Sequence, residues 1–127
     1  MNTNEKEIVH KDLSYKIIGL AMEIHSKLSY GFLEKVYENA LMLLLRRGGI
    51  EAKQQAPIKV YFEGEVVGEY FADILVEDKI ILEIKVLDKI TDVQRAQTLN
   101  YLKATRLELA IILNFGKRKL EYERLIY

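Results

Sequence analysis

The sequence of 127 residues contains no cysteine and only two histidines. The absence of cysteine excludes disulfide bridges, thiolate zinc sites and cysteine nucleophiles. His10 and His25 lie fifteen residues apart in one predicted helix, so neither a catalytic triad nor a histidine metal cage is indicated, and His25 is interpreted as a packing residue. A GxSxG elbow and a GxxxxGK[ST] loop are also missing, which argues against a serine hydrolase and a P-loop nucleotidase.

Long hydrophobic runs and an excess of charge are missing as well. The longest apolar run, residues 40–45, is six residues long, far below the roughly 20 that a spanning helix needs. The polar N-terminus predicts no signal peptide, so we expect a soluble protein with cytoplasm as its default location. Nineteen basic residues balance nineteen acidic ones, so the overall field does not favour nucleic acid, although basic clusters such as residues 117–119 allow local patches.

Two predicted helices precede every strand. Apolar residues at helical spacing predict an amphipathic helix over residues 6–28 and a second over residues 33–45, which Gly48-Gly49 ends. Alternating or apolar segments then predict strands and one more helix, with Pro57 as a break before the first strand. These are strands at 58–62, 66–76 and 79–86, a helix at 91–105 capped by Thr91 or Asp92, and strands at 107–113 and 119–126.

This order, ααβββαββ, predicts an α/β fold with helices packed around one mixed sheet. A chain of this length, half of it hydrophobic, suffices for one continuous core, so we expect a single domain over residues 1–127.

Glu83 and Lys85 are conspicuous because their predicted strand is apolar on both faces. Residues two apart in a strand project to the same face, so these two charges are expected together. Asp73 lies on the preceding strand, and a tight turn at Glu77-Asp78 predicts antiparallel pairing. That pairing sets Asp73 opposite a residue near 82 or 83, beside Glu83.

Neighbouring carboxylates in an apolar sheet repel each other unless a cation lies between them or one is protonated. Hard oxygen ligands suit Mg²⁺ or Mn²⁺, which polarises a phosphodiester and activates water, and Lys85 would orient that water. We predict that the Ile84 carbonyl joins Asp73 and Glu83 as a metal ligand. The alternative, an ordinary Glu83–Lys85 pair on a solvated strand face, stays open at this point.

A third carboxylate, Glu34, begins the second predicted helix, where the helix dipole favours negative charge. Glu34 is therefore either a helix-terminal charge or a residue that faces the sheet, whereas Glu38 one turn later is interpreted as solvated. In the third helix Gln97 and Tyr101 share a face. They offer an amide and a phenol to a phosphate, a base or a water, or else they simply pack on the sheet.

Taken together, the motifs resemble those of the GxxExxY proteins of the PD-(D/E)xK nuclease superfamily, across nearly the whole chain. The naming motif is Gly31…Glu34…Tyr37. Further matching segments are Ile24-His25, residues 37–41, residues 73–77, residues 82–85, residues 96–105 and Asn114-Phe115-Gly116.

The resemblance implies a restriction-endonuclease-like (PD-(D/E)xK) core. In such a core Asp73 and Glu83 bind the metal, Lys85 is the catalytic lysine and Glu34 is the helix carboxylate.

Gln97 and Tyr101 resemble the QxxxY element of the RecB-like exonuclease branch. Two departures stand out: Glu69-Tyr70-Phe71 replaces an expected Gly-x-Arg, and Gln94 stands where a histidine is usual.

Two main functions follow for this chain. The first is a Mg²⁺- or Mn²⁺-dependent nuclease that hydrolyses DNA, or less readily RNA, with metal-activated water. The second is a catalytically weak or inactive module of the same fold that binds nucleic acid or a protein partner, with a homodimer as one form. A purely structural oligomer is a third.

Overall fold

A computed structural model describes residues 9–127 of the chain. The elements follow the predicted order. They are α2 (Lys11–Leu28), α3 (Glu34–Arg47), β1 (Ala52–Phe62), β2 (Glu65–Val76), β3 (Ile80–Lys85), α4 (Asp92–Thr105), β4 (Leu109–Asn114) and β5 (Glu121–Ile126). The helix predicted over residues 6–28 corresponds to α2, which begins at Lys11, and residues 6–8 lie outside the described residues. Among residues 9–127, none of the helices is long and apolar enough to cross a membrane.

The five strands form one sheet in the order β1-β2-β3-β4-β5. β3 and β4 pair in parallel and are connected through α4, whereas the other neighbouring strands pair antiparallel. The predicted α/β fold with a mixed sheet is therefore confirmed. β3 and β4 are inner strands whose residues are almost all buried, which explains their continuous apolar runs.

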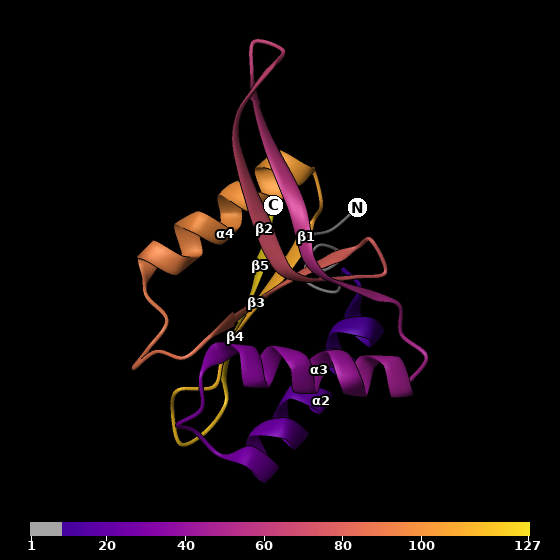
Figure 1. The fold of residues 1–127 in the computed structure, drawn as a ribbon, viewed down its shortest axis with the longest axis vertical. Coiled ribbons are helices and arrows are strands. Elements are labelled where there is room, and N and C mark those ends of the chain that lie inside the picture. The colour runs from indigo at the N-terminus through magenta and orange to yellow at the C-terminus, as the bar shows by residue number, and fades with distance from the viewer. Residues whose placement is uncertain (1–8) are drawn as a thin grey trace.

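Helices cover both faces of the sheet: α2 and α3 pack on one face and α4 on the other (Figure 1). Ile80, Leu82 and Ile84 belong to the core under α2 and α3, whereas Ile81 belongs to the core under α4. Because side chains alternate along a strand, Glu83 projects to the face of Ile81. The charged residues of β3 thus share the face that α4 covers.

The β1–β2 hairpin is longer than predicted and extends beyond the rest of the sheet (Figure 1). β1 begins at Ala52 and contains Pro57 opposite Phe71, so Pro57 is not a break before the strand. Proline has no N–H to donate to a ladder and is therefore restricted to edge strands or bulges. β1 is an edge strand of the sheet, which is why it tolerates Pro57.

Local geometry fixes the remaining boundaries. Glu77 and Asp78 both have positive φ (50° and 54°), and the Lys79 N–H donates to the Val76 carbonyl at 2.9 Å. This is a two-residue type I′ turn, as antiparallel hairpins prefer.

The last two strands differ slightly from their predicted bounds. β4 is Leu109–Asn114 rather than residues 107–113, and β5 is Glu121–Ile126 rather than residues 119–126.

Candidate active site

The strands β2 and β3 part where Asp73 and Glu83 face each other. Their ladder ends at the pair Ile74 and Leu82. Beyond it, the Asp73 N–H donates to Glu83 Oε2 at 3.0 Å, and the Ile84 N–H donates to Asp73 Oδ2 at 2.7 Å. The predicted register of the two strands is therefore confirmed. Two carboxylates replace backbone carbonyls as hydrogen-bond acceptors in this fork between β2 and β3.

Burial makes the charged form of both carboxylates costly. Glu83 is only 3% exposed, and its burial, followed by repulsion from Asp73, raises the pKa of Glu83 to about 8. Burial also raises the pKa of Asp73, with a further increase from the charge of Glu38, while the Ile84 N–H lowers it. Groups of this kind take up a proton or a cation because two neighbouring negative charges repel each other in a poorly solvated site.

Lys85 is the positive charge of the site. It is half-buried at the end of β3, and its ammonium lowers the pKa values of Glu34, Asp73 and Glu83. Within residues 9–127, no carboxylate oxygen lies within 4.0 Å of its ammonium nitrogen. Its charge therefore acts on three carboxylates at once and is bound to none of them.

Glu34 is the first residue of α3 and is exposed. Partial burial raises its pKa, the charge of Lys85 lowers it, and the charges of Asp73 and Glu38 raise it. Glu34 thus lies within electrostatic reach of the fork. The described part of the chain nevertheless contains no group of three or more acidic or histidine side chains gathered as a metal cage.

Tyr37 fixes the loop that leads into Glu34. Its hydroxyl donates to the Ser29 carbonyl at 2.7 Å and accepts from the Phe32 N–H at 3.3 Å. Gly31 in this loop has φ +116°, a conformation that residues with a Cβ rarely adopt. The Tyr37 ring stacks on Phe115 at 4.6 Å. Tyr37 therefore positions the start of α3 and does not belong to the acidic site.

The prediction that Glu38 is solvated is wrong. Glu38 is 3% exposed and accepts hydrogen bonds from Lys35 Nζ at 2.9 Å, from Gln54 Nε2 and from Gln55 Nε2 at 3.1 Å. Gln55 Nε2 also lies 3.4 Å from Asp73 Oδ1. Glu38 thus holds the amide that approaches Asp73. The missed signal was its helical spacing to the buried residues Leu41 and Leu45.

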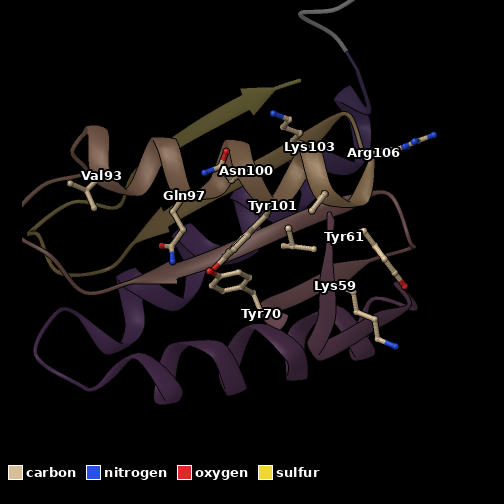
Figure 2. Close-up of a pocket in the computed structure, with 11 residues that line it drawn as sticks. Lys59, Tyr61, Tyr70, Val93, Gln97, Asn100, Tyr101, Lys103 and Arg106 are labelled. Carbon is tan, nitrogen blue, oxygen red and sulfur yellow. The ribbon is translucent and has the colours of Figure 1, made fainter. Parts of the chain in front are cut away.

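Gln97 and Tyr101 lie on the α4 side of the fork, and Tyr101 is 7% exposed. Burial raises the pKa of Tyr101, the charges of Glu83, Tyr70 and Asp73 raise it further, and a hydrogen bond with Gln97 lowers it. The ring of Tyr70 lies 5.6 Å from the ring of Tyr101. Figure 2 shows the Gln97 amide and the Tyr70 ring beside the Tyr101 hydroxyl. The predicted pair therefore borders the acidic site.

The segment Asn114-Phe115-Gly116 has a structural role. The fully buried side-chain amide of Asn114 binds the loop after β3: its oxygen accepts from the Leu87 N–H at 2.9 Å, and its nitrogen donates to the Leu87 carbonyl at 3.0 Å. The next residue, Phe115, donates its N–H to the Lys85 carbonyl at 2.9 Å. A Cβ on Gly116 would lie 2.5 Å from Leu87 backbone atoms, so only glycine fits. Together they fix the end of β3 that carries Lys85.

His25 is a packing residue, as predicted. Its Nε2 lies 2.6 Å from the Lys117 carbonyl oxygen, and its ring stacks with that of Phe115, with the ring centroids 6.2 Å apart.

Gln94, which stands where a histidine is expected, closes a capping box: its Oε1 accepts from the Thr91 N–H at 2.7 Å. Thr91, rather than Asp92, is therefore the cap of α4.

A mixed sheet covered by helices on both faces, with two carboxylates and a lysine at the fork of two strands, is consistent with the core of a nuclease-type α/β protein. The sequence pattern of the PD-(D/E)XK nuclease superfamily matches residues 11–125. The chain belongs to this superfamily. A comparison with curated proteins finds no match.

Proposed function

We propose that this protein is a Mg²⁺- or Mn²⁺-dependent nuclease that hydrolyses DNA phosphodiester bonds, and that it belongs to the GxxExxY group of its superfamily. The observation that carries the proposal is the hydrogen-bonded arrangement of Asp73 and Glu83 beside Lys85 at the strand fork. Hydrolysis breaks one P–O bond of the DNA and joins the water oxygen to phosphorus. One DNA fragment then ends in a phosphate, and the other takes a proton and ends in a hydroxyl group.

The donor set fits a hard divalent cation. Asp73 and Glu83 each accept a backbone N–H through one oxygen. The second oxygen of Glu83 is left for a metal, and the second oxygen of Asp73 receives only the long contact of 3.4 Å from Gln55 Nε2. The Ile84 N–H points to β2, and N–H and C=O of one strand residue point the same way, so the Ile84 carbonyl faces the fork too. Burial raises the pKa values of both carboxylates, and the charges of neighbouring carboxylates raise them further. A bound cation would favour the charged form of both groups.

Bound there, Mg²⁺ or Mn²⁺ supplies Lewis acidity toward a phosphate oxygen and lowers the pKa of a coordinated water. The residues of the chain then divide the remaining work. The Lys85 ammonium neutralises charge that develops on the attacked phosphate. Glu34, exposed at the start of α3, accepts a hydrogen bond from water that enters the site.

A single observation favours a binding module without catalysis. Gln94 is engaged in the capping box of α4, so the histidine expected at this position has no substitute in the acidic site. In this second candidate the fork would bind a cation and nucleic acid or a protein partner without turnover. A homodimer and a cytoplasmic location stay predictions under either function.

The test is metal-dependent cleavage of single- and double-stranded DNA and RNA by the whole chain. Asp73→Asn and Glu83→Gln are expected to lower the cleavage rate at least about 100-fold, as removal of an essential electrostatic group does. Glu108→Gln is the matched control because Glu108 is exposed on the loop before β4. Cleavage that survives both fork substitutions, or no cleavage with either metal, contradicts the nuclease proposal. Binding of Mn²⁺ without cleavage supports the second candidate.

A further inference from the structure

A groove of about 1020 Å³ runs between the β1–β2 hairpin and α4 (Figure 2). Among residues 9–127, the lining includes three cations, Lys59, Lys103 and Arg106, and no acidic residue. The whole chain has a formal net charge of zero. The groove is therefore a local positive surface on a neutral protein, and such a surface attracts an anionic ligand.

Tyrosines form much of the remaining lining. Tyr61 is 61% exposed and Tyr70 is 48% exposed, and both lie on the hairpin side of the groove. Both rings are therefore accessible to a ligand in the groove. Gln97 and Asn100 add amides from α4. Flat aromatic faces, amides and cations together fit a ligand that has bases as well as phosphates.

The groove opens beside the carboxylate fork. Tyr101 lines the groove, and the charges of Glu83 and Asp73 act on its hydroxyl. Arg106 and Lys59 lie toward the C-terminal end of α4, beyond Tyr101, whereas Gln97 lies toward its N-terminal end (Figure 2). A nucleic-acid strand that follows α4 from Arg106 to Tyr101 therefore passes from the cations to the residue on which the carboxylates act.

We propose that this groove binds a single strand of nucleic acid, with unpaired bases stacked on Tyr61 and phosphates on Lys59 and Arg106. This inference rests on the proposed function, because it names the form of substrate that the fork receives. Stacking on an exposed ring requires a base that is free of its partner. A duplex presents only its backbone and groove edges, so it leaves Tyr61 without a role.

The test measures binding separately from cleavage, by fluorescence anisotropy of a labelled oligonucleotide in EDTA. The arms are single-stranded DNA, single-stranded RNA of the same sequence and the DNA duplex. Tyr61→Ala is expected to weaken single-strand binding about 5- to 150-fold, the range for loss of one stacked base. Tyr61→Phe keeps the ring and should retain binding. Tyr15→Ala is the matched control because Tyr15 is 71% exposed on α2, away from the groove.

Tighter binding of either single strand than of the duplex, lost in Tyr61→Ala alone, supports the inference, and the preferred arm identifies DNA or RNA. Duplex binding as tight as single-strand binding, or an unchanged Tyr61→Ala variant, overturns it. The two proposals fail separately. Metal-dependent cleavage with unchanged Tyr61→Ala binding removes only the groove assignment, whereas ring-dependent binding without cleavage removes only the nuclease function.

Discussion

The two faces of the sheet differ in how completely they are closed. In the described part of the chain, the core under α2 and α3 contains fifteen buried residues, whereas the core under α4 contains seven, of which three are alanines. Hydrophobic stabilisation scales with buried apolar area. The first face therefore supplies more of the folding free energy, while the smaller core of the second face leaves space for the groove.

The two faces also differ in the kind of side chain that the motifs place on them. On the first face Tyr37, Phe115 and His25 stack in a row and hold the start of α3 against the end of β4. On the second face Glu83 is buried, and burial together with Asp73 raises its pKa. Tyr37 and Phe115 of the first face thus position the site, whereas Glu83 of the second face, together with Glu34 at the start of α3, acts on the substrate under the proposed function.

The largest expected effect is a loss of stability with rising pH in the metal-free protein. The pKa of Glu83 is raised to about 8 in the folded state, so the protonated form favours folding. This contribution is complete below the ordinary pKa of a glutamate, near 4.5, and is lost as pH rises toward 8. The free energy of unfolding should fall by about 3 kcal/mol between about pH 5 and pH 8.

Urea unfolding in EDTA measures this effect, and subtraction of the Glu83→Gln profile removes the contributions of other groups. Mg²⁺ at the higher pH should restore stability, because a ligand that binds only the folded state favours folding. If the free energy of unfolding depended on pH equally in the two proteins, the charged form of Glu83 would not destabilise the folded state.

A comparable effect is expected from the first face. Leu45→Ala removes a fully buried side chain of α3 and should lower the free energy of unfolding by about 2 to 5 kcal/mol. Val93→Ala, in the groove, changes a residue that is 73% exposed and should cost less than about 0.5 kcal/mol. Chemical denaturation at one pH compares the two. Equal losses would contradict the division between a stabilising face and an open face.

Much of the site is predictable from the sequence because it depends on local rules. The turn at Glu77-Asp78 sets the register of β2 and β3, and the strand period of two then brings Asp73 to Glu83. Lys85 follows from the same period. The fold follows equally from element order, since helix and strand periods are visible in the apolar pattern.

Other features depend on contacts between distant segments, which spacing alone does not reveal. Gln55 has a positive φ of 54°, rare for a residue with a side chain, and reaches both Glu38 and Asp73. The cations of the groove come from β1 and from the end of α4, so a neutral composition conceals them. Pro57 is acceptable in β1 only because that strand lies at the edge.

A smaller effect than that of Leu45→Ala is expected at Glu38, which links the first face to the fork through Gln55. Glu38→Gln keeps the shape but turns an amide donor toward Gln54 and Gln55, so we expect about 1 kcal/mol lower stability. If Glu38 positions Asp73, Mn²⁺ affinity should also fall about tenfold, as for other groups that orient metal ligands. Titration calorimetry with Mn²⁺ checks this, with exposed Glu51→Gln as the matched control. Lower stability with unchanged Mn²⁺ affinity would confine Glu38 to packing, because a residue that only supports α3 has no reason to alter metal binding at the open face.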